Sequence, residues 1–100
     1  MDSQELLLAA IVEMVPGAAE AGQRYEDAVL ELLGRHGGTL ERRTRGTDGT
    51  AEVHLIRFRD RAGYEAFMAD PDRAAHRAEA GDAAPTTRVI EVHDVNAGDS

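Results

Sequence analysis

The tripeptide Glu-Val-His occurs twice in this chain, as Glu52-Val53-His54 and as Glu91-Val92-His93. In a β-strand the first and third residues share a face, so each glutamate would lie beside its histidine. A neighbouring carboxylate raises the pKa of an imidazole and fixes its tautomer, which is the arrangement of a general base. We therefore treat His93, Glu91 and His54 as candidate catalytic residues. The competing interpretation is that both pairs are ordinary polar residues at strand ends.

Two further side chains are candidates for contact with a substrate. Arg57 would bind an anion if it pointed into a cavity, because a guanidinium matches the geometry of a carboxylate. A surface ion pair is its alternative use. Tyr64 would present its phenol to a cavity between a helix and the sheet, with core packing as the alternative. His36 is expected only to interact with the dipole at a helix C-terminus.

Other classes of site lack their residues. There is no cysteine, which removes disulfides, thiol nucleophiles and thiolate metal sites. No His-Glu-x-x-His or comparable spacing predicts a metal site. No glycine-rich loop starts a helix, as phosphate binding requires, and the only serines are terminal. We therefore predict no metal ion and no cofactor.

Composition indicates one domain of 100 residues, with a core over 6–95 and a polar tail at 96–100. The net charge of −8 would repel polyphosphate, so nucleic acid and anionic membranes are not expected partners. The acidic N-terminus is unlike a signal peptide, and the apolar run Leu6 to Val12 is far too short to span a bilayer. These features predict a cytoplasmic protein.

The hydrophobic pattern predicts the order β-α-β-β-α-β. Strands are expected at 6–15, 39–45, 51–59 and 86–95, and helices at 18–36 and from Asp60 to Asp70-Pro71, with a weakly packed segment at 73–79. Within the first helix, Glu26 is assigned to the solvent-facing side. This order is the split βαβ plan of a ferredoxin-like α+β domain, with helices on one face of a four-stranded antiparallel sheet.

The uncovered face of that sheet predicts a homodimer. If Ile56 points at the helices, His54 does too, and Val53 and Leu55 face away from them. Apolar side chains of this kind should not be left to water. A second copy of the chain, related by a two-fold axis, is the expected cover.

The orientation of the last strand decides where the second Glu-His pair lies. If Ile90 and Val92 point at the helices, Glu91 and His93 face the cavity enclosed by the dimer, beside Arg57. On that reading the two Glu-His pairs lie on opposite faces of the sheet.

Several residues carry a resemblance to a known group. They are Gly37-Gly38, the strand His54-Leu55-Ile56-Arg57-Phe58, the aromatics Tyr64 and Phe67, and Asp70-Pro71. With them the chain resembles the dimeric α+β barrel superfamily over about residues 6 to 95. It is most similar to short bacterial barrels of unassigned function and more distantly to antibiotic-biosynthesis-type monooxygenases. Those monooxygenases often place Trp or Asn near the substrate, whereas this chain has no Trp and only Asn96.

The resemblance implies two functional hypotheses. The first is a homodimer that binds or converts a small organic molecule in a mostly apolar pocket, as a cofactor-independent monooxygenase or isomerase-like enzyme. The second is a non-catalytic dimeric interaction module. A cavity of several hundred Å³ with converging polar groups would favour the first, and a barrel filled by Leu and Val the second.

Overall fold

The computed structural model describes residues 4–95, and the polar tail predicted at 96–100 lies outside them. The elements in chain order are β1 (Leu6–Glu13), α1 (Ala19–Leu30), the 3₁₀ turn η1 (Leu33–His36), β2 (Gly38–Arg45), β3 (Ala51–Phe58), α2 (Arg61–Met68), α3 (Pro71–Ala80), the 3₁₀ turn η2 (Gly81–Ala83) and β4 (Thr86–Val92). This order confirms the predicted split βαβ plan.

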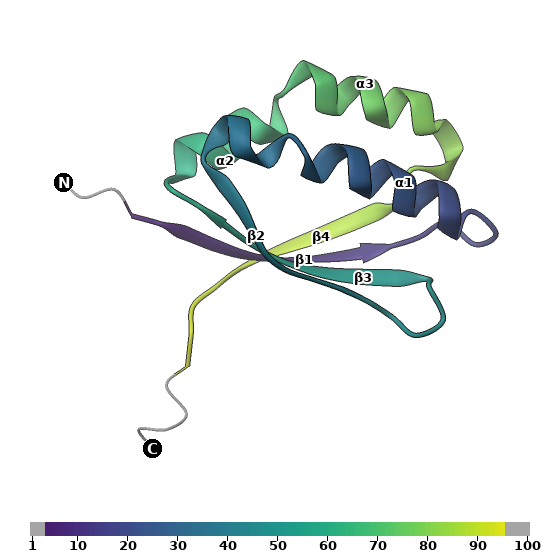
Figure 1. The fold of residues 1–100 in the computed structure, drawn as a ribbon, viewed down its shortest axis with the longest axis horizontal. Coiled ribbons are helices and arrows are strands. Elements are labelled where there is room, and N and C mark those ends of the chain that lie inside the picture. Colours follow the sequence, from purple (N-terminus) through teal and green to yellow (C-terminus); the bar gives the residue numbers. More distant parts are fainter. Residues whose placement is uncertain (1–3, 96–100) are drawn as a thin grey trace.

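The four strands form one antiparallel sheet in the order β2-β3-β1-β4. All helices lie on one face of it, with α1 and α3 side by side, as Figure 1 shows. β1 takes a central position because it carries apolar side chains on both faces of the sheet. Its consecutive residues Leu7 and Leu8 point to opposite faces, and both are buried. The fold is therefore the predicted ferredoxin-like α+β domain.

The first helix is shorter than predicted. α1 ends at Leu30, and just before η1 the N–H of Leu32 bonds to the carbonyl of Val29 at 3.0 Å. These tighter i→i−3 bonds bring both Leu32 and Leu33 into the core. Gly37 then ends the segment with a φ of +74°, the left-handed conformation that its lack of a Cβ allows.

The predicted caps of the later helices are confirmed. Asp60 accepts a hydrogen bond from the backbone N–H of Gly63 at 2.8 Å, and Asp70 accepts one from Asp72 at 2.8 Å. Pro71 occupies the first position of α3. None of the α3 residues is buried, as expected for that weakly packed segment.

The strand register separates the side chains into two faces. On the helix face Ala10 lies opposite His54 and Val12 opposite Glu52. The other face, which we call the open face, is covered by no helix of residues 4–95 (Figure 1). Its apolar residues are Leu7, Ala9, Ile11, Val53, Leu55, Ile90 and Val92. Val53 is 46% exposed there, so the predicted apolar, uncovered sheet face is present.

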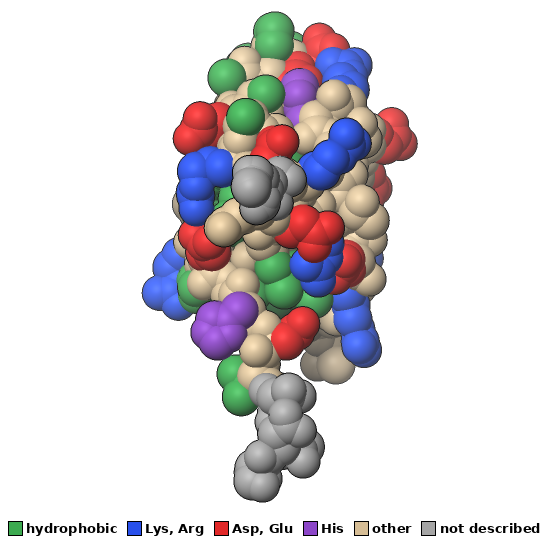
Figure 2. All heavy atoms as spheres, turned by 90° about the vertical axis from the view of Figure 1, so that its left-hand side faces the viewer, with side chains coloured by type: hydrophobic (Ala, Val, Ile, Leu, Met, Phe, Trp, Pro, Cys, Tyr) green, Lys and Arg blue, Asp and Glu red, His purple; other side chains and the backbone are tan. Residues whose placement is uncertain are grey.

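The end of the molecule where the chain begins has a surface of mixed character. Figure 2 shows acidic and basic side chains interspersed over it, with small hydrophobic areas between them. Within residues 4–95, no helix has both the length and the apolar composition to cross a bilayer.

Candidate functional site

A cavity of about 280 Å³ lies between the helix face of the sheet and the three helices. Most of its wall is apolar, from residues that include Leu8, Ala10, Val12, Val29, Ile56, Phe58, Phe67 and Val89. The ionisable groups in the wall are few: Tyr25, Glu26, His54, Tyr64, Arg73 and Arg77. An apolar cavity with a small number of polar groups is typical of a small-molecule site.

His54 and Glu52 form a buried pair beside this cavity. His54 is 1% exposed and Glu52 is 0% exposed, and Nε2 of His54 lies 2.7 Å from Oε1 of Glu52. The two residues are separated by one position of β3, so the strand itself places both side chains on the helix face. The predicted contact within the first Glu-Val-His tripeptide is thus confirmed.

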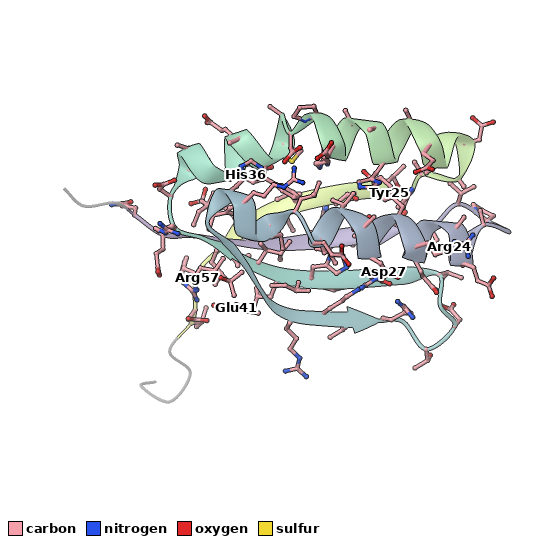
Figure 3. The ribbon with its side chains drawn as sticks, turned by 45° about the horizontal axis from the view of Figure 1, so that its top comes forward. Arg24, Tyr25, Asp27, His36, Glu41 and Arg57 are labelled. Atoms are coloured by element: carbon pink, nitrogen blue, oxygen red, sulfur yellow. The ribbon has the colours of Figure 1, made fainter. Side chains whose placement is uncertain are left out.

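Two arginines of β2 hold Glu52 in its ionised form. Arg43 donates to both carboxylate oxygens, at 2.8 and 3.2 Å, and Arg45 donates at 2.8 Å. Burial by itself would raise the pKa of Glu52, but the hydrogen bonds from Arg43, His54 and Arg45 outweigh it and lower the pKa to about 2. Arg43 also bonds to Asp27 of α1 at 2.7 Å, which ties the sheet edge to the helix (Figure 3 labels Asp27).

The tautomer of His54 follows from the charge of Glu52. An ionised carboxylate only accepts hydrogen bonds, so Nε2 of His54 carries the proton that is donated to it. In the neutral imidazole Nδ1 is then a free acceptor, and it lies 3.9 Å from Oε1 of Glu26. The ring is therefore oriented as a proton acceptor at the cavity wall.

Glu26 is the second ionisable group of the site. It comes from α1 and is 5% exposed. Burial, reinforced by the nearby negative charge of Glu52, raises its pKa from 4.5 to about 7, although Arg43 and other arginines oppose the shift. A carboxyl with this pKa takes up and releases protons near neutral pH, which suits acid–base catalysis.

Of the other residues singled out from the sequence, Tyr64 lines the cavity and packs edge-to-face on Phe58 with centroids 5.6 Å apart. Arg57 lies on the open face, away from the cavity, and pairs with Glu41 at 2.6 Å and Glu5 at 3.2 Å. Figure 3 shows Arg57 and Glu41 together at this side of the sheet. Arg57 thus forms the surface ion pairs that were its alternative use.

The condition that would have placed Glu91 and His93 beside Arg57, with Ile90 and Val92 towards the helices, is not met. Ile90 pairs with Ala9 on the open face, so Glu91 points to the helix side, where Arg61 of α2 donates to it at 2.9 Å. His93 follows the end of β4, is exposed, and within residues 4–95 forms a hydrogen bond with the carbonyl of its neighbour Asp94 at 3.1 Å. The edge position of β4 leaves both of its faces partly exposed, so alternation alone could not assign them.

His36 has a specific partner, so the expected dipole interaction does not describe its role. Its Nε2 lies 2.7 Å from the buried carboxylate of Asp70, to which Arg35 also donates at 3.2 Å. The bond from His36, together with the backbone N–H of Asp72, lowers the pKa of Asp70 to about 2. This cluster ties η1 to the start of α3.

Glu26 was assigned to the wrong face of its helix. The buried residues of α1 are Gly22, Tyr25, Glu26 and Val29, which are positions i, i+3, i+4 and i+7 of one helix face. That spacing was a readable signal. The charge of Glu26 led to its assignment to the solvent side. Only the proximity of His54 in the folded chain shows why an acid lies on the buried face.

No family profile and no curated protein sequence match this chain. Solved structures do match. SnoaB of Streptomyces nogalater, a cofactor-independent oxygenase, is 17% identical with a TM-score of 0.75, over 94% of this chain and 96% of SnoaB. A proposed antibiotic biosynthesis monooxygenase from Nitrosomonas europaea is 13% identical with a TM-score of 0.74, over 96% and 95%. A Pseudomonas aeruginosa protein is 20% identical with a TM-score of 0.72, over 93% and 96%.

This chain shares the ferredoxin-like α+β fold of these solved structures. A fold of this kind hosts unrelated reactions, so the reaction has to be argued from the cavity and its side chains. Among residues 4–95, no group of three or more His, Asp or Glu side chains is arranged to hold a metal ion.

Proposed function

We propose that this protein is an enzyme that binds a small, mostly apolar organic molecule in the cavity and removes a weakly acidic proton from it. The observation that carries the proposal is the buried row Glu26, His54 and Glu52. Two of its members line the cavity, and the third fixes the imidazole tautomer from behind. In this scheme His54 is the base, and Glu26 is the carboxyl that exchanges the proton near neutral pH.

The proton is transferred to Nδ1 of His54, and the substrate is left as a carbanion or phenolate. Reprotonation at another atom gives an isomer. Reaction with dioxygen instead converts a CH₂ group into C=O, with one oxygen atom retained in the product and the other released as water. SnoaB is described as a cofactor-independent oxygenase, which supports the second course. Tyr64, also in the wall, is a substrate-contacting residue in either case.

The proposed functional unit is a homodimer joined through the open faces. Val53 and Ile90 expose apolar surface there, which a second copy would bury. The alternative of a non-catalytic dimeric module has less support, because an interface protein has no need of a carboxyl that titrates near neutral pH in an apolar cavity.

Hydrogen exchange into a carbon acid tests the proposal. 1-Tetralone is apolar, bicyclic and weakly acidic next to its carbonyl, so the wild-type protein should accelerate exchange of those hydrogens in D₂O, measured by NMR. A parallel oxygen-electrode trace shows whether dioxygen is consumed. His54→Gln should lower the exchange rate at least about 100-fold, the usual contribution of a positioned base.

His93→Gln is the matched control, because it removes the other imidazole that the sequence offered as a candidate base. We expect exchange to depend on His54 and to persist without His93. Loss of exchange in His93→Gln with full activity in His54→Gln would show that His93, at the end of β4, is the base. Exchange no faster than the buffer rate, across a panel of ketones and phenols of this size, would remove the proposed reaction.

A further inference from the structure

Helix α3 brings two arginines to the cavity. Arg73 and Arg77 are four residues apart, so they share one face of the helix, and both line the cavity. The arginines that form ion pairs within residues 4–95 are Arg35, Arg43, Arg45, Arg57 and Arg61. Arg73 and Arg77 pair with no acid in that part of the chain. Within residues 4–95, the two arginines in the cavity wall therefore have no acid in direct ion-pair contact.

Arg73 has unused hydrogen-bonding capacity. Its Nε is buried and has no hydrogen-bond partner among the described residues, while Nη1 makes only a 3.4 Å bond to the carbonyl of Met68. Its guanidinium carbon lies 5.5 Å from the ring centroid of Phe67, another residue of the cavity wall. A buried N–H without a partner is unfavourable, so this group is suited to an acceptor that a ligand supplies.

Arg77 complements it one turn further along the helix. Nη1 of Arg77 donates to the carbonyl of Pro85 at 3.3 Å, which anchors the side chain beside the last strand. The positive charges of both arginines also lower the pKa of Glu26, which is the one acid among the described residues of the cavity wall. Both arginines therefore lie within electrostatic range of the proposed reaction site.

We infer that Arg73 and Arg77 form an anion subsite, and that the substrate is an apolar molecule carrying a carboxylate. The inference rests on the proposed function, because it names the substrate class of the same cavity. Guanidinium groups bind carboxylates through paired, charge-assisted hydrogen bonds. The chain as a whole has a net charge of −8 and repels anions, so attraction of a carboxylate has to come from a local site.

Two ligands of matched shape test the subsite. 2-Naphthoate carries the carboxylate, and 2-acetylnaphthalene replaces it with a neutral ketone of similar size. Calorimetric titration at neutral pH should show that the wild-type protein binds the naphthoate at least about tenfold more tightly. Arg73→Gln should remove most of that preference while changing affinity for the ketone less than twofold. Arg77→Gln should have the same effect to a smaller degree.

Arg24→Gln is the control, because Arg24 is exposed on α1, where Figure 3 labels it, and does not line the cavity. It changes the net charge equally and should leave both affinities unchanged. Equal wild-type affinity for the two ligands, or equal weakening of both by Arg73→Gln, would overturn the subsite and leave the proposed function standing. Failure of both ligands to bind would overturn the subsite and the proposed function together.

Discussion

Nδ1 of His54 lies 3.9 Å from Oε1 of Glu26, across the junction of β3 and α1. The imidazole is fixed by Glu52 on its other side, so the short space between His54 and Glu26 is where a proton would be exchanged with the cavity. Because burial raises the pKa of Glu26 to about 7, the ionisation of Glu26 also affects the stability of the fold.

Glu26→Gln should stabilise the protein at alkaline pH. The pKa of Glu26 is higher in the folded chain than its ordinary 4.5, so the folded state favours the protonated form. Wild-type stability should therefore fall as the pH rises from 4.5 to about 7 and then level off, with a total loss of roughly 3 kcal/mol. Glutamine mimics the protonated form and should avoid that loss.

Thermal unfolding of both proteins between about pH 4.5 and pH 8 provides the measurement. Tm values should coincide at the acidic end, and the variant should melt higher at the alkaline end. A constant difference across the range would mean that Glu26 keeps its ordinary pKa in the folded chain. The variant should also lose proton exchange into substrate, because glutamine cannot titrate.

Asp70→Asn should lower Tm by several degrees at neutral pH. The amide still caps α3, but the negative charge that His36 and Arg35 contact is removed. The folded pKa of about 2 lies below the ordinary 3.8, so the stabilisation is fully present above pH 3.8 and is lost as the pH falls through about 2.

The difference in Tm between wild type and Asp70→Asn should accordingly shrink as the pH is lowered from 3.8 towards 2. Asp72→Ala is the comparison, because its 2.8 Å ion pair with Arg35 is exposed and should contribute little. An equal effect of the two substitutions would contradict the importance given to the buried carboxylate.

Val53→Lys should dissociate the proposed dimer without unfolding the protomer. Val53 is 46% exposed on the open face, so its replacement removes little packing within one chain. At an interface between two open faces, by contrast, it would bury an unpaired charge. Sedimentation equilibrium at micromolar concentration should show a wild-type dimer and a monomeric variant with near-normal circular dichroism. A monomeric wild type would end the dimer proposal.

Gly63→Ala should be destabilising although alanine is the better helix former. The gain in helix propensity is about 1 kcal/mol, but a Cβ at Gly63 would collide with the backbone carbonyl of His36, which cannot rotate away. We expect a net loss of about 1–2 kcal/mol in denaturant unfolding. In the control variant Gly34→Ala the new Cβ meets nothing within 4 Å, so this variant should be neutral or slightly stabilising. If Gly34→Ala destabilised the protein more than Gly63→Ala, η1 and α2 would have to separate easily.

Local features that depend on neighbouring residues were predictable from the sequence. The caps at Asp60 and Asp70, the left-handed Gly37 and the contact between Glu52 and His54 each involve residues within three positions of one another. Backbone geometry sets such contacts directly. The element order and the ferredoxin-like plan followed from the hydrophobic pattern.

The sequence by itself determined which residues would form strands and helices, and that the first Glu-His pair would share a face, because periods of 2 and 3.6 residues are set by the backbone. Only the tertiary structure decided that Glu26 and Arg43 meet this pair from two other elements, and that Arg73 lines the same cavity. It also decided that Glu91 and His93 lie elsewhere. The physical reason is that these meetings join residues distant in sequence. They depend on how the helices pack over the sheet and on which way an exposed edge strand faces, and neither leaves a local pattern in the chain.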